Sequence, residues 1–293
     1  MPINSNTLHI GGVAHLSTTY EGLLSLTDSL NASGQILGLL NLAMRNPQIT
    51  IPEVGQILRL DVVLSARIIR IANTAFFFKT TRTCHTIEEA LTRVGLREIA
   101  RLVATSNMRD RAPDYLQTYG LSGEQFNKSV RFTAAACQLI AAEIQMNANL
   151  AYLAGLIRPL GILVLNQWSS KHVPVIAKPA WSRVGDLLKW EQATFGLNHL
   201  NVSSFITREW GLPKVVSESI EKSSGPSHSV NNCPMTLILQ TADALAKSNR
   251  VALFGHHDGS ALDKECLNFL GIKTVKLIEI SREASRKSQK VAV

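Results

Sequence analysis

Side chains that could bind a metal are few and scattered along this chain. His256-His257-Asp258 places two imidazoles beside a carboxylate, which are ligand types that zinc and other transition metals use. Gly255 and Gly259 flank this run, and glycines on both sides predict a loop without the apolar neighbours of a core helix. We therefore expect a surface loop there, and an adventitious surface metal site is the alternative.

Other chemical motifs are missing from the sequence. It has no glycine-rich phosphate loop, no Gly-x-Ser-x-Gly turn and no His-Glu-x-x-His helix. The four cysteines lie far apart without a Cys-x-x-Cys pair, which predicts reduced thiols rather than a disulfide framework or zinc ribbon; they are Cys84, Cys137, Cys233 and Cys266. We expect no catalytic residue, no metal and no cofactor.

Arginines recur every four residues in one segment, at Arg93, Arg97 and Arg101. On a helix this spacing gives one basic stripe. The stripe is either a solvated face with Glu89 and Glu98 nearby, or a docking face for an acidic partner or for phosphates. Three other arginines would widen it if they fold close by: Arg67, Arg70 and Arg109.

Three consecutive phenylalanines, Phe76, Phe77 and Phe78, precede a Lys-Thr-Thr-Arg segment. Three neighbouring side chains cannot all be buried on one helix face. We expect at least two to pack in the core. The remainder, with Phe77 as the candidate, would be an exposed patch that binds a partner.

Length and composition predict an ordered globular protein. The 293 residues suffice for one large or two small domains, and 45% are apolar against 18% charged. The net charge of +8 permits an acidic partner, nucleic acid included, without requiring one. The first residues lack a basic segment leading into an apolar run, so we expect a cytoplasmic protein without a signal peptide. Leu150 to Trp168 is apolar but interrupted by Arg158, Pro159 and Asn166, which favours a buried helix over membrane insertion.

The elements that must position these residues are helices. Apolar residues follow the helical period through most of the chain, and no convincing alternating strand appears. We predict an all-α fold with capping boxes at Thr86–Glu89 and Ser122–Gln125. We expect a flexible leader at 1–18, a frayed basic tail at 281–293, and helices in the segments 37–44, 54–72, 87–103, 123–144, 149–168, 181–195, 216–220, 237–246 and the one that ends at Trp210-Gly211.

Two groups of motifs resemble the HDOD family, the HD-related output domains of bacterial signalling proteins. The first comprises Asn46-Pro47, then Leu64-Ser65-Ala66-Arg67-Ile68-Ile69-Arg70-Ile71-Ala72-Asn73-Thr74-Ala75-Phe76, then Thr86 to Glu98. The second comprises Phe195 to His199, Trp210-Gly211-Leu212-Pro213 and Ala242-Asp243-Ala244. The resemblance implies a two-lobed helical domain over 19–280. A helical lobe at 19–117 would pack on a degenerate HD-like helical core at 118–280.

The resemblance also implies where metals would bind in an active HD phosphohydrolase. Those positions fall on Lys128, Arg158, Pro159, His199, Ser223, Ser224 and Asp243. Only His199 and Asp243 keep a ligand type, because a guanidinium has no lone pair and proline has no ligating side chain. We interpret these two as a buried pair that satisfies itself. If Lys128 and Arg158 both point into the core, a small anionic ligand would fit between them.

Three functions remain for comparison. The leading hypothesis is a non-catalytic regulatory module that binds a protein partner, or a small ligand, in a bacterial signalling pathway. The first alternative is a metal-dependent phosphohydrolase, such as a cyclic-dinucleotide phosphodiesterase, with altered ligands. The second alternative is a nucleic-acid-binding regulator, motivated by the +8 charge and the arginine stripe.

Overall fold

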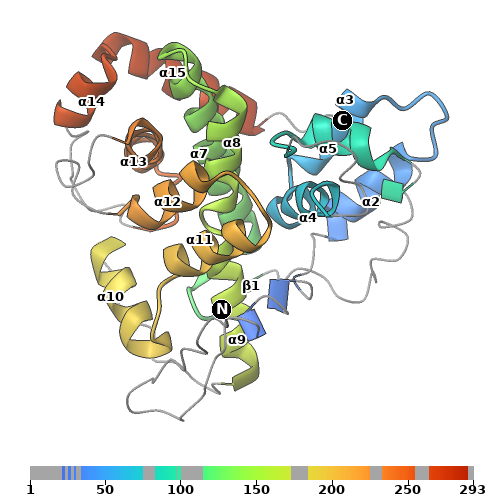
Figure 1. Ribbon diagram of the computed structural model, residues 1–293, viewed down its shortest axis with the longest axis horizontal. Helices are drawn as coiled ribbons and strands as arrows, with labels where there is room; N and C mark the ends of the chain where they lie inside the picture. Colours follow the sequence, from blue (N-terminus) through green and yellow to red (C-terminus); the bar gives the residue numbers. More distant parts are fainter. Residues whose placement is uncertain are drawn as a thin grey trace, which may run out of the picture.

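A computed structural model describes residues 22–23, 26–27, 30, 34–74, 83–96, 98–99, 115–172, 184–224, 233–254 and 264–289. Within these ranges the protein is built from helices, apart from one hairpin of two-residue strands. The all-α prediction is confirmed. Figure 1 shows two lobes side by side, with α7 and α8 running through the middle of the molecule.

The first lobe contains α2 (Gly34–Ala43), α3 (Ile51–Leu58), α4 (Val62–Ala72) and α5 (Ile87–Val94). The apolar run from Val54 to Ala72, predicted as one helix, forms two. Asp61 divides it, because its carboxylate accepts hydrogen bonds from the backbone amides of Val63 and Leu64 and so caps the start of α4.

The predicted capping box at the start of α5 is half formed. The hydroxyl of Thr86 accepts a hydrogen bond from the amide of Glu89 at 2.9 Å, as expected. The Glu89 carboxylate instead accepts from the amide of His85. One residue earlier, Cys84 is fixed to the end of α4, since its amide donates to the Asn73 side chain and its carbonyl accepts from it.

The second lobe begins with a hairpin, β1 (Tyr115–Leu116) and β2 (Leu121–Ser122), paired antiparallel with Tyr115 opposite Ser122. The predicted capping box at Ser122 and Gln125 is complete. The helices that follow are α7 (Gly123–Glu143), α8 (Ala148–Ile157), α9 (Leu160–His172), α10 (Val184–Phe195), α11 (His199–Glu209), α12 (Lys214–Lys222), α13 (Pro234–Ser248), α14 (Lys264–Leu270) and α15 (Thr274–Gln289).

Small residues bring α7 and α8 into close contact. A Cβ atom on Gly155 would lie 2.9 Å from Cys137 Sγ and 3.0 Å from Ala134 Cα. Real Cβ atoms do not approach other atoms so closely without displacement, so glycine is required there. Ala134 on the facing helix is likewise small enough to allow this approach.

The segment predicted as one helix over 149–168 is two helices, α8 and α9, that meet at a turn formed by Arg158 and Pro159. Proline has no amide hydrogen and interrupts a helix. By length and composition, Ala148–Ser170 could cross a membrane, yet 67% of its apolar window is buried inside the protein. This burial agrees with a core helix of a folded domain.

Arg131 of α7 joins the two lobes. Its guanidinium donates to the carbonyl of Leu60, between α3 and α4, and to the carbonyl of Ser288 in α15. Residues 281–289, expected in the basic tail, continue α15, where Ala284 and Ser288 are buried. Arg282, Arg286 and Lys287 are exposed there.

Candidate functional site

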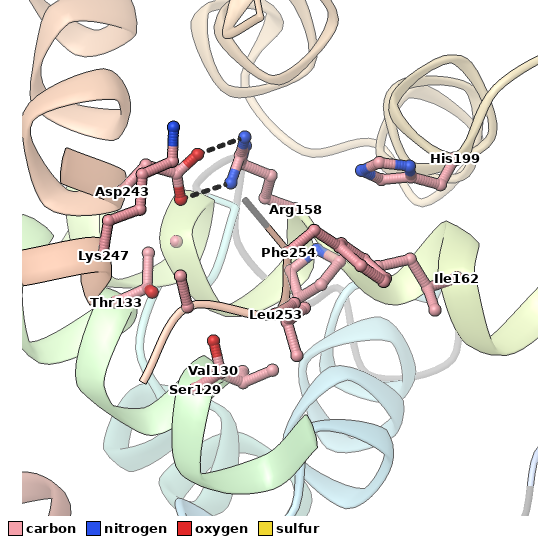
Figure 2. A pocket seen from close by; sticks show the side chains of 13 residues that line it. Ser129, Val130, Thr133, Arg158, Ile162, His199, Asp243, Lys247, Leu253 and Phe254 are labelled. Carbon is pink, nitrogen blue, oxygen red and sulfur yellow. Dashed lines mark hydrogen bonds and ion pairs between the residues drawn. The ribbon is translucent and has the colours of Figure 1, made fainter. Parts of the chain in front are cut away.

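The HD-like core contains a small cavity of about 40 Å³. Its walls come from α7, the turn between α8 and α9, α11, α13 and the loop after α13. Figure 2 shows Ser129 and Thr133 on one side, Asp243 and Lys247 on another, and His199 across from them. At about 10–15 Å³ per water, this space holds a few water molecules and excludes a nucleotide.

Arg158 fills the centre of this site with its own side chain. Its guanidinium forms a two-point ion pair with Asp243, with Nη1 2.7 Å from Oδ1 and Nη2 2.6 Å from Oδ2 (Figure 2). The third donor, Nε, reaches Ser223 Oγ at 2.8 Å. Paired donors and acceptors of this kind are the strongest hydrogen bonds in proteins. One arginine therefore satisfies two positions at which an HD enzyme would hold metal.

The backbone around Arg158 is fixed by α11. The hydroxyl of Ser203 donates to the Arg158 carbonyl at 2.7 Å and accepts from the Gly161 amide at 2.8 Å. A Cβ atom on Gly161 would overlap the carbonyl of His199. The turn containing Pro159 and the start of α11 thus approach so closely that only glycine fits between them.

His199 has a carboxylate partner, but it is not Asp243. Its Nδ1 lies 2.8 Å from Oε2 of Glu191 in α10, and its amide donates to the same carboxylate. The Tyr119 hydroxyl also donates to Glu191, at 2.8 Å. Burial, and then the charge of Glu191, raise the pKa of Tyr119 well above its usual value. The prediction that His199 and Asp243 form a buried pair is therefore wrong, because His199 pairs with Glu191 and Asp243 pairs with Arg158.

Glu191 is a site residue that the sequence analysis missed. It is fully buried, between Leu187 and Phe195 on the same helical face. An acid spaced four residues from buried apolar residues on both sides lies on the core face of its helix. That position was the available signal, because a buried carboxylate requires a partner.

The remaining positions that the resemblance assigns to metal ligands differ in their burial. Ser223 is buried and bonded to Arg158, whereas Ser224 is exposed. Lys128 is exposed and does not line the cavity. The condition for an anionic ligand, that Lys128 and Arg158 both point into the core, is therefore not met. Arg158 alone points inward, and its charge is paired with Asp243.

These residues do not fit a two-metal centre. The Asp243 carboxylate is occupied by Arg158 at both oxygens, and the Nδ1 atom of His199 by Glu191. Among the residues that the structure describes, no three His, Cys, Asp or Glu side chains are grouped as metal ligands. An HD centre needs several such donors around each ion. Arg158 is thus paired with Asp243 and His199 with Glu191, and His199 lines the small cavity.

Of the three arginines in the predicted basic stripe, the structure describes Arg93 alone. Arg93 is half-buried and donates to the carbonyl of Ala72 at the end of α4. Arg67 and Arg70 also face inward, toward the Leu30 carbonyl and the Trp210 ring. The other predicted contact residues, Arg97, Arg101 and Phe77, lie outside the described residues, as do Arg109 and the run 256–258.

Comparison with known proteins points to one family. The model of the HDOD domain matches residues 34–226. A response regulator, MmoQ of Methylococcus capsulatus str. Bath, is similar in structure with a TM-score of 0.68 and 20% identity, covering 87% of this chain and 99% of its own. A virulence factor from Campylobacter jejuni gives a TM-score of 0.65 at 20% identity, covering 94% and 98%. At this identity the two structures show a shared fold alone. No curated protein matches the chain.

Proposed function

Since the chain belongs to the HDOD domain family, we propose that it is a non-catalytic signalling module, which acts in the bacterial cytoplasm by binding a partner protein. The observation that carries this proposal is the two-point ion pair between Arg158 and Asp243. It puts a fixed cation where an HD phosphohydrolase needs metals and consumes the carboxylate that would bind them.

The fold supports a binding role in a second way. The HD-like core remains well packed without its chemistry, with Ser223, Ser203 and Gly161 fitted to the arginine. The side chains of Arg158, Asp243 and Ser223 are paired with one another, whereas a site that had only decayed would leave them unpaired, at a cost of about 1–3 kcal/mol each. Here the core is retained as a scaffold. The similar response regulator from Methylococcus is compatible with a place in a signalling pathway.

The first test measures metals and hydrolysis. Protein purified without a metal-affinity column or chelator should contain almost no iron, manganese, nickel or zinc. It should also leave bis(p-nitrophenyl) phosphate and cyclic dinucleotides intact with each ion added. One to two ions per chain, lost in His199→Ala or Asp243→Ala, would show an enzyme instead.

The second test addresses signalling. A variant with Arg158→Met and Asp243→Leu removes the polar centre while keeping side chains that can pack. In the parent organism, this variant should restore the transcript profile of a deletion strain as well as the wild type does. In a photocrosslinking experiment, the variant should also crosslink to the same protein partner as the wild type does. Loss of complementation by a variant that is folded and present at normal levels would contradict a non-catalytic role.

A further inference from the structure

A second cavity lies where the two lobes meet and shares no lining residue with the HD-like cavity. Its volume is about 330 Å³, within the range of small-molecule sites, roughly 300–1,000 Å³. The first lobe contributes Leu30 and the start of α4. The second lobe contributes β1, the start of α7 and one face of α9.

Most of the lining is apolar. Val62 and Val63 come from α4, Phe126 from α7 and Leu163 from α9. Leu116 of β1 adds to the same wall. Surfaces of this type accept the faces of a flat, weakly polar ring system, because apolar contact there removes water from both partners.

Side-chain amides provide open hydrogen-bonding groups in this lining. Asn166 lines the cavity and is only 6% exposed; its Oδ1 accepts from the Thr118 amide, and its Nδ2 makes no hydrogen bond to another described residue. Asn127, half-buried on α7, makes no side-chain hydrogen bond within the described part of the chain. Gln117 stands exposed beside them. Together they offer both donors and acceptors without charge.

The charge of the described lining disfavours anions. Among the described lining residues the charged one is Asp61, an acid whose carboxylate caps α4. A phosphate or carboxylate ligand would need a cation that these residues do not supply.

We infer that this cavity binds a neutral planar heterocycle of nucleobase or nucleoside size. The amides of Asn127 and Asn166 would recognise its donor and acceptor edge, as asparagine and glutamine do with base edges in nucleic acids. The apolar walls would contact its faces, as in enzyme pockets that receive a flipped base. The bound ring would touch α4 of one lobe and α7 and α9 of the other. This binding does not depend on whether the HD-like core is catalytic.

The experiment titrates the full chain with adenosine, guanosine, cytidine and uridine, and with their 5′-monophosphates, by calorimetry. At least one nucleoside should bind with a dissociation constant below about 1 mM, and its monophosphate should bind about tenfold more weakly. No binding by any of the four nucleosides would overturn the inference. Equal or tighter binding of the monophosphates, or of a cyclic dinucleotide, would overturn it as well.

The variant Asn127→Leu removes one amide and fills part of the cavity, and it should weaken the nucleoside about tenfold or more. Asn268→Leu makes the same change on the exposed surface of α14 and should bind as the wild type does. If Asn127→Leu does not fold, Asn127→Ala removes the same amide without added bulk and should also weaken binding. Wild-type affinity in the folded Asn127 variant would show that the cavity is not the site.

Discussion

The guanidinium of Arg158 and the carboxylate of Asp243 face each other across the HD-like core with both donor–acceptor pairs within 2.7 Å. Arg158 lies in the turn between α8 and α9 and Asp243 lies in α13, 85 positions further along the chain. The pair gives Asp243 a partner at a position where the family resemblance would place a metal ligand. In this structure Asp243 is the counter-charge of a largely buried arginine.

We predict that the ion pair shows strong coupling in a double-mutant cycle. Arg158→Met or Asp243→Leu alone leaves one charge unpaired and should lower the free energy of unfolding by about 2–4 kcal/mol, somewhat below fully buried pairs. These losses should be smaller than those for a fully buried ion pair because the Asp243 side chain is 27% exposed, so water partly solvates its charge. The double variant should lose less stability than the two single variants together. Its loss in the free energy of unfolding should be at least about 1.5 kcal/mol smaller than the sum of their two losses. Urea denaturation measures all four proteins, and additive losses would contradict the prediction.

Gly161→Ala should be strongly destabilising. Its new Cβ would overlap the backbone carbonyl of His199, which cannot move without displacing α11. We expect a loss of about 3 kcal/mol or more, measured by thermal and urea unfolding. The matched control is Gly38→Ala in α2, where a Cβ meets nothing within 4 Å. That change should stabilise the protein by about 0.5–1 kcal/mol, because alanine favours a helix. Similar effects at both glycines would refute the close approach.

Alkaline pH should destabilise the protein through Tyr119. Burial and then Glu191 raise the pKa of this hydroxyl above 10.0, its unperturbed value. The unfolded chain therefore releases the proton at a pH where the folded protein keeps it. The stability contributed by the raised pKa is complete below pH 10 and declines above it, by about 1.4 kcal/mol per pH unit. In Tyr119→Phe the decline from pH 10 to 11 should be smaller by about 1 kcal/mol, because half of the unfolded chains have already lost this proton at pH 10. Parallel stability curves for the two proteins would disprove the assignment.

Arg131→Met should weaken the connection between the lobes. The substitution keeps the apolar stem but removes hydrogen bonds to the carbonyls of Leu60 and Ser288. We expect a loss of about 1.5–3 kcal/mol, with faster amide hydrogen exchange at the end of α15. Arg208→Met is the control, because its ion pair with Glu221 is half exposed and should contribute at most about 1 kcal/mol. Equal losses would show that Arg131 has no special role.

Local signals in the sequence predicted much of the helical framework. Ser122 and Gln125 formed the expected capping box, and Trp210-Gly211 ended its helix as expected, since such contacts join neighbours in the chain. Splits at Asp61 and at Pro159 were missed, because long apolar runs masked a cap and a turn.

The sequence alone predicted the fold class, because an all-α fold depends on residue types and on spacing within helices. An incomplete set of HD ligands was implied by the resemblance to the HDOD family. Only the tertiary structure decided which charges meet. It paired Arg158 with Asp243 and His199 with Glu191, and it placed Lys128 on the surface. Partner choice among distant ionic groups depends on how helices pack, and a few ångströms decide whether two charges neutralise each other or remain in solvent.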